Sequence, residues 1–260
     1  MGVQDIATLK QDLRRQILSG DTSGLAGANL SSLELAGADF SGANLHEVNL
    51  WQADLSYASF VGANLLEADL RGSNQVGAEL AAATMQKAAL LRANLEGATL
   101  VGARLERAEL EESNLRAANL RGANLRRING LHADFAAADL SHTVLDGADL
   151  GHARLGRASL NDADLKAARL RQADLAGAQL MRADLSGADL SGADLSGANL
   201  SRATLRQANF ANADLTSADL TKSDLSGARL KGAILAGARY DAHTVWPADF
   251  DPKAVGANPA

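Results

Sequence analysis

Aspartate recurs every five residues in the segment ADLSGADLSGADLSGANLS, residues 183–201, at Asp184, Asp189 and Asp194. A row of carboxylates can hold a hard cation if the fold brings its members together. The chain has no cysteine, which excludes disulfides, thiolate nucleophiles and zinc–cysteine sites. Whether the aspartates act as a set therefore depends on the elements that carry them.

The five-residue spacing extends far beyond this segment. From Leu25 to Tyr240, every residue whose number divides by five is Leu or Phe, except Gln75, Met85, Gly130 and Tyr240 itself. This makes 44 successive units without an insertion, mostly with Ala two residues before the Leu and Asp or Asn between them. A period of five does not fit a helical face, which repeats near 3.6 residues. Ala and Leu two apart point to one side of an extended backbone, so each unit is predicted to be a three-residue strand and a two-residue corner.

Glycine often ends the unit, at a position where a type II turn needs a positive φ. Examples are Gly42, Gly62, Gly102, Gly187 and Gly192. Because the chain turns the same way at each corner, we expect it to coil around an axis filled with Leu. Each coil is then hydrogen-bonded to the next at a spacing of about 4.8 Å.

Two units depart from the pattern and predict local irregularity. Gly130 replaces a central Leu, and Ile128 replaces the preceding Ala, so the isoleucine can return the lost volume to the same layer. Gln75, beside Ser73, is predicted to be a buried amide that needs hydrogen-bond partners or water.

The motif A-[D/N]-L-x-x resembles that of the pentapeptide-repeat family over residues 23–242. The resemblance implies an all-β solenoid in which four units make one turn of a right-handed, quadrilateral parallel β-helix. The 44 units then correspond to about 11 coils and a rod of roughly 50 Å. The segment from Tyr240 to Pro252 also resembles the C-terminal tail of many cyanobacterial members of the family.

A solenoid exposes its core at both ends and therefore needs caps. Ile6, Leu9, Leu13 and Ile17 have helical spacing, which predicts a short capping α-helix over residues 4–19, in an N-terminal domain of residues 1–22. A helix that binds a membrane surface or a partner is the alternative.

Residues 243–260 are predicted to form a C-terminal cap or tail. Trp246 and Phe250 are expected to fold back over the last coil, and Pro247 and Pro252 to stop further strand pairing. No apolar run approaches the about 18 residues of a membrane span. The N-terminus lacks the apolar stretch of a secretory signal, so a cytoplasmic location is expected.

Residues 20 apart share a face if four units make one coil. Asp174, Asp194 and Asp214 then line up and could hold a hard cation, although a solvated acidic strip is the preferred interpretation. His132 and His152 fall in one column and could bind a transition metal, but both are predicted to be corner residues in water. No metal and no cofactor is therefore predicted.

An enzymatic function is not expected. No Ser, His and Asp converge in a cleft, and neither a phosphate-binding loop nor a GxSxG elbow is present. A rod that is convex on every side should lack a deep pocket.

The surface is then predicted to carry the function. Outward apolar residues favour the N-terminal half, and arginines crowd one face of the middle coils, as protein-binding anchors often do. The possible partner-binding surface comprises Trp51, Leu91, Leu131, Val61, Val101, Arg104, Arg107, Arg126 and Arg127.

The function predicted from these features is that of a non-enzymatic scaffold or regulator that binds proteins of unknown identity through the faces of a rigid rod. The net charge of -6, without a basic patch, argues against direct nucleic-acid binding. A monomer or a weak end-to-end dimer is expected. The alternative, implied by the resemblance, is a DNA mimic that binds gyrase or topoisomerase and protects it from inhibitors, although Arg interrupts each acidic column.

Overall fold

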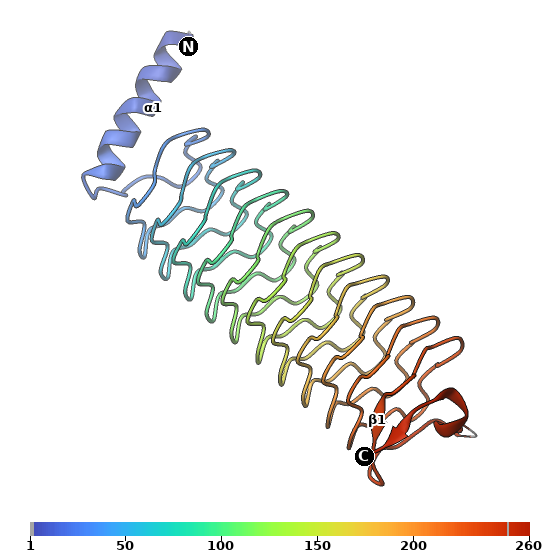
Figure 1. The fold of residues 1–260 in the computed structure, drawn as a ribbon. Helices are drawn as coiled ribbons and strands as arrows, with labels where there is room; N and C mark the ends of the chain where they lie inside the picture. Colours follow the sequence, from blue (N-terminus) through green and yellow to red (C-terminus); the bar gives the residue numbers. More distant parts are fainter. Residues whose placement is uncertain (1–2, 249) are drawn as a thin grey trace.

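The computed structural model describes residues 3–248 and 250–260, with the side chains of residues 3–7 outside the description. From Leu25 onward the chain winds into a rod of stacked coils (Figure 1). One helix, α1 (Val3–Leu18), stands at the N-terminal end of the rod. A small two-stranded sheet and a 3-10 helix lie at the other end.

The corner between two strands is the repeated element of local structure. Each corner is closed by a backbone hydrogen bond, as from the N–H of Ala28 to the carbonyl of Leu25 at 3.0 Å. From Gly27 to Gly237 all 43 second corner residues have a positive φ, and 26 of them are not glycine. This backbone is the type II turn that the glycines predicted. An L residue in this region costs roughly 1–2 kcal/mol, so contacts between coils must offset the strain.

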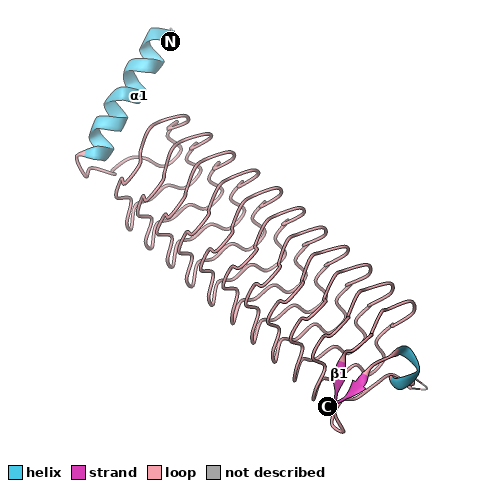
Figure 2. Cartoon of the chain, in the orientation of Figure 1, coloured by secondary structure: helices cyan, strands magenta, loops and turns pink. Residues whose placement is uncertain are grey.

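Hydrogen bonds between residues about 20 apart stack the coils. The N–H of Leu30 donates to the carbonyl of Asn49 at 2.7 Å, and the N–H of Asn49 donates to the carbonyl of Ala28 at 2.9 Å. Parallel bridges repeat this register from Asn29 to Arg239, so four units complete one coil. Only the central residue of each three-residue strand forms a bridge, and Figure 2 therefore shows the coils as loops.

The core is a single column of Leu and Phe side chains along the axis, bordered by Ala. Phe40 and Phe60 stack in successive coils, with ring centroids 4.8 Å apart. At Gly130 an added Cβ would lie 3.5 Å from Cδ1 of Ile128 and 3.0 Å from Cδ2 of Leu150. Ile128 thus borders the space that the missing Leu leaves, as predicted, and Leu150 of the next coil approaches it more closely.

Gln75 is fully buried, as the sequence predicted. Its Nε2 donates to Oγ of Ser73 at 2.9 Å, and that hydroxyl donates to the carbonyl of Leu70 at 2.7 Å. Within the described residues, its Oε1 has no hydrogen-bond partner. The repeat therefore tolerates a polar layer in which the Gln75 amide nitrogen has a partner and the amide oxygen has none.

The helix occupies nearly the residues predicted for it, but its apolar face is only partly covered. Ile17 is buried and Leu13 packs against the core, whereas Leu9 is 49% exposed. The prediction for the side chain of Ile6 lies outside the described residues. No helix in the described part of the chain has both the length and the hydropathy that crossing a bilayer requires.

Two cationic side chains of α1 reach the open edge of the first coil. Nζ of Lys10 donates to the carbonyl of Ser31 at 2.7 Å, and Nε of Arg14 donates to the carbonyl of Glu34 at 2.8 Å. These carbonyls occupy positions that would accept from a preceding coil. The helix thus satisfies edge groups of the first coil with charged donors.

The C-terminal segment completes the last coil. Trp246 packs edge-on against Tyr240, with ring centroids 5.6 Å apart, and stacks on Phe250 at 5.2 Å, so both fold back as predicted. The prediction that strand pairing stops at Pro252 is wrong. The 3-10 helix Lys253–Val255 and Gly256, with φ 83°, turn the chain back, and the strands β1 and β2 then pair in parallel. These strands are Arg239–Tyr240 (β1) and Asn258–Pro259 (β2).

Corner strain predicts opposite effects of two single substitutions. Gly197 has φ 65°, and no atom lies within 4 Å of an added Cβ, so Gly197→Ala should cost about 1 kcal/mol through backbone strain alone. Ala117→Gly, at φ 54°, should raise stability by less, because glycine also loosens the unfolded chain. Thermal melting of both variants checks this, and a higher melting temperature for Gly197→Ala would contradict it.

Candidate binding surface

The aspartates on the strands anchor the corners that follow them. Asp174, Asp194 and Asp214 bridge one another on three successive coils, so the predicted column exists. Their Oδ1 atoms accept the backbone N–H groups of Ala176 (3.0 Å), Ser196 (2.8 Å) and Thr216 (2.8 Å). The described residues contain no group of three His, Asp or Glu side chains that could hold a metal ion. One oxygen of each carboxylate thus has a structural role.

His132 and His152 are exposed on successive coils and stack, with ring centroids 4.8 Å apart and planes 20° apart. Nearly parallel rings direct their nitrogens along parallel lines rather than at one point. The carboxylate of the previous coil, Glu112, is bound to Arg92 at 2.7 Å. The pair is therefore a stacked column rather than an assembled metal centre.

The predicted partner surface divides between two opposite edges of the rod. Since each coil has four corners, residues ten apart occupy opposite corners. Trp51, Leu91 and Leu131 share one corner column, which we name the tryptophan edge. Val61 and Val101 lie on the diagonally opposite corner. One partner would have to wrap around the rod to contact both.

The exposure of these residues also differs. Trp51 and Val61 are 43% exposed and Val101 is 37% exposed, whereas Leu91 and Leu131 are half-buried. The most exposed large apolar side chain of the coils, Tyr57 at 70%, was missed by the sequence reasoning. Its position as a second corner residue, two after a core Leu, could have revealed it.

The predicted arginines lie next to the Val101 corner. We name the outward side of residues 101–107 and 121–127, two successive coils, the arginine face. It carries five arginines, Arg104, Arg107, Arg121, Arg126 and Arg127. The sequence reasoning missed Arg121, which stands one coil after Val101 in the same column. Apolar and cationic side chains thus border one face.

A hollow of about 280 Å³ lies at one corner of the arginine face. Glu106, Arg107, Arg126 and Arg127 line it. Arg126 is paired with Asp146 of the next coil at 2.7 Å. Within residues 3–248 and 250–260, no ion pair forms at Arg107 or Arg127. Two guanidinium groups at this corner are therefore available to an anion.

The same corner holds acceptors without donors. Oε1 of Glu106 accepts from Nδ2 of Asn124 at 2.7 Å, but its Oε2 is buried and has no hydrogen-bond partner among the described residues. Oε1 of Gln86, at the equivalent corner position one coil before Glu106, is also buried without a hydrogen-bond partner among the described residues. A buried acceptor without a donor costs about 1–3 kcal/mol.

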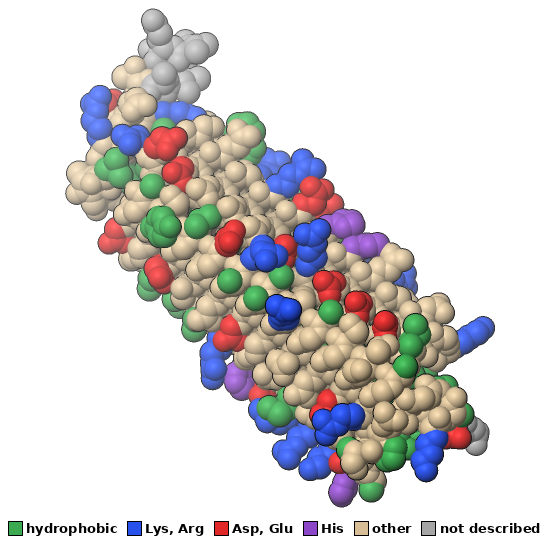
Figure 3. Space-filling view, viewed as in Figure 1, with side chains coloured by type: hydrophobic (Ala, Val, Ile, Leu, Met, Phe, Trp, Pro, Cys, Tyr) green, Lys and Arg blue, Asp and Glu red, His purple; other side chains and the backbone are tan. Residues whose placement is uncertain are grey.

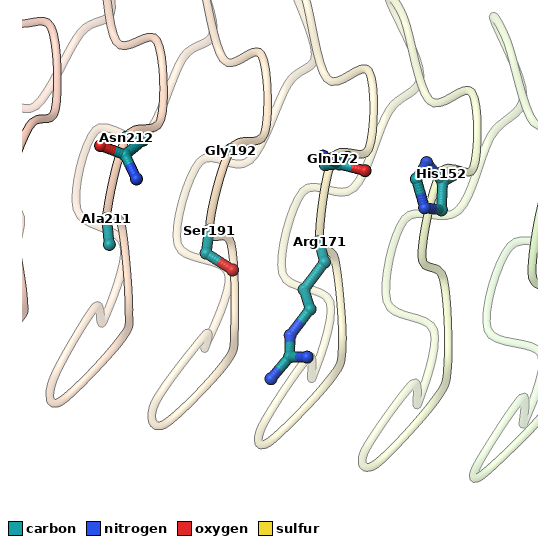
Figure 4. A pocket seen from close by; sticks show the side chains of 7 residues that line it. All are labelled: His152, Arg171, Gln172, Ser191, Gly192, Ala211 and Asn212. Carbon is teal, nitrogen blue, oxygen red and sulfur yellow. The ribbon is translucent and has the colours of Figure 1, made fainter.

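Three further open hollows, of about 390, 450 and 660 Å³, lie farther along the rod and share Arg171. Figure 4 shows the second of these, where His152, Arg171 and Gln172 precede the short side chains of Ser191 and Ala211 on the following coils. Such hollows form because short corner residues follow long ones.

Charges of both signs are interspersed over the side of the rod in Figure 3. Many are paired along a column, as in Lys87–Glu67 at 2.7 Å and Arg182–Asp162 at 2.6 Å. No single sign of charge runs from end to end on the visible side. The arginine face is distinguished by Arg107 and Arg127, for which no ion pair forms among the described residues.

Comparison with known proteins adds family relationships. The family model for pentapeptide repeats matches in eight copies, over residues 25–59, 52–86, 90–127, 132–162, 158–197 and 198–237. No curated protein sequence matches the chain.

Among solved structures, HetL is a pentapeptide repeat protein involved in heterocyst differentiation regulation from the cyanobacterium Nostoc sp. strain PCC 7120. It is 39% identical, with 88% of this chain and 95% of HetL covered and a TM-score of 0.62. The pentapeptide repeat protein alr5209 from Nostoc PCC 7120 is 41% identical over 39% of this chain and 84% of its own, with a TM-score of 0.39. QnrB1, a plasmid-mediated fluoroquinolone resistance protein, is 18% identical over 91% of this chain and 89% of its own, with a TM-score of 0.49.

Acid should destabilise the rod through its corner-anchoring carboxylates. Hydrogen bonds from the Thr216 side chain and backbone lower the pKa of Asp214, and those from Ser41 lower the pKa of Asp39. A lowered pKa stabilises the fold above the unfolded value near 3.9, and this stabilisation is lost as pH falls through the folded value. The melting temperature of Asp39→Asn/Asp214→Asn should therefore fall less than that of the wild type between pH 5 and pH 2.

The asparagines keep an acceptor for each corner N–H but not its negative charge, so the double variant should melt below the wild type at pH 7, and the difference should shrink towards pH 2. Identical acid dependence of the two proteins would show that these carboxylates do not contribute.

Proposed function

Because the chain belongs to the pentapeptide-repeat family, whose members form right-handed quadrilateral β-helices, we propose that it is a non-enzymatic interaction protein that binds a protein partner through the arginine face. The observation that carries the proposal is the pair of unpaired guanidinium groups at Arg107 and Arg127, beside the apolar corner of Val61 and Val101. Arginine is enriched among the residues that carry most of the binding energy in protein interfaces.

The rigidity of the rod suits this role. The proposed rod has about 11 coils and is capped at its N-terminal end by α1. Its corners hold outward side chains at fixed spacing. A partner can then bind without paying the cost of ordering the surface. The cytoplasmic location expected from the sequence stays a prediction.

The relatives support a regulatory role to different degrees. HetL, which is similar over most of both chains, is involved in the regulation of heterocyst differentiation, and we extend to this chain only the idea of a regulatory role. QnrB1 is similar at 18% identity, which shows the fold alone. Protection of gyrase, the second function predicted from the sequence, has no specific observation in its favour. Arginine interrupts the acidic columns that a DNA mimic would need, as Arg154 does between Asp134 and Asp174.

Affinity capture with matched variants tests the proposal. The immobilised wild type, Arg107→Glu/Arg127→Glu and Trp51→Ala are exposed to a lysate of the organism that encodes the chain, and bound proteins are quantified by mass spectrometry. We expect at least one protein to fall fivefold or more with the arginine-face variant and to be retained by Trp51→Ala, on the opposite edge. Identical bound sets for all three proteins would contradict the proposal.

A further inference from the structure

The unpaired state of Arg107 and Arg127 is unusual for their column. Both are second corner residues, one coil apart, so their backbones are about 4.8 Å from each other. One and two coils before Arg107, the same column pairs Lys87 with Glu67 at 2.7 Å. Like charges side by side on adjacent strands are destabilising. The corner therefore carries positive charge that the rod itself does not neutralise.

The hollow beside these arginines limits what can enter. Its volume of about 280 Å³ accommodates one or two side chains rather than a folded domain. The guanidinium groups of Arg107 and Arg127 can each bind a carboxylate through two parallel hydrogen bonds. The first requirement for a ligand is thus an anionic group on a narrow segment.

The second requirement is apolar groups. Val61 and Val101, which are 43% and 37% exposed, lie at the neighbouring corner of the same face. A free oxyanion offers acceptors only and would leave these side chains uncovered. An extended peptide that carries both acidic and apolar side chains meets both requirements.

We propose that the corner formed by Glu106, Arg107, Arg126 and Arg127 binds an extended acidic segment of the partner protein. Carboxylates of the segment pair with the guanidinium groups of Arg107 and Arg127. Apolar side chains of the segment contact the face near Val101, across the strand that carries Arg104. The inference rests on the proposed function and names the chemistry of the partner.

The test uses a fluorescein-labelled peptide of alternating Glu and Val, titrated with the full chain and followed by fluorescence anisotropy. The same peptide with Gln in place of Glu is the ligand control. We expect saturable binding of the acidic peptide and at least tenfold weaker binding by Arg107→Gln/Arg127→Gln. Arg157→Gln/Arg202→Gln is the matched control, because it removes two exposed arginines elsewhere on the rod and changes net charge equally.

Competition separates a peptide from a free anion. Pyrophosphate and a short single-stranded oligonucleotide are titrated as competitors. Displacement of the peptide by pyrophosphate at equal or lower concentration would identify a simple anion site and overturn the proposal.

Three other outcomes would also overturn it. They are equal losses in the two double variants, binding of the oligonucleotide at least tenfold tighter than that of the peptide, and no saturation up to millimolar protein. Melting temperatures of all variants establish that each is folded. If the acidic peptide does not bind, the result of the affinity capture still stands, because a partner that needs the arginine face could bind it by another chemistry.

Discussion

The left-handed corner is the constraint on which the rest of this structure depends. Every fifth residue takes a positive φ and turns the chain by the same amount, so that the strand between two corners is only three residues long. Most of these positions are occupied by residues other than glycine, and each of those adds strain. The hydrogen bonds between coils and the buried Leu column offset that strain, which makes the fold stable only as a stack.

The same constraint determines what the surface can do. Corners and strand centres present side chains at fixed positions, and the nearest neighbours of a side chain are those 20 residues away. Charged groups therefore find partners along columns, as Arg126 does with Asp146. Long corner side chains also lie over the next coil: the ring of Tyr57 covers Gly77 so closely that a Cβ there would come within 2.7 Å of it. Chemistry on this rod is a property of columns, and the arginine face is notable because one of its columns lacks counter-charges.

Departures from the repeat show how the layers of the core compensate. Ile128 of the same unit and Leu150 of the next coil border the space at Gly130, and Gln75 is held by Ser73 two residues earlier. The compensation at Gln75 is local, whereas that at Gly130 also uses the next coil. The ends follow a different rule. There the missing neighbour is a whole coil, and α1 and the C-terminal segment replace it with charged donors, aromatic packing and the short β1–β2 pairing.

The sequence by itself determined the strand-and-corner unit, the Leu-filled axis, the glycine turns and the compensation at Gln75, because all of these depend on contacts within about five residues. The predicted aspartate and histidine columns followed once four units per coil were taken from the family resemblance. Only the tertiary structure decided which outward residues become neighbours, since a five-residue period does not specify that four units make one coil. It added Arg121 and Tyr57 to the exposed set, left Leu9 uncovered and returned the chain to pairing after Pro252. These features depend on hydrogen bonds and packing between residues 20 or more apart, which no local pattern encodes.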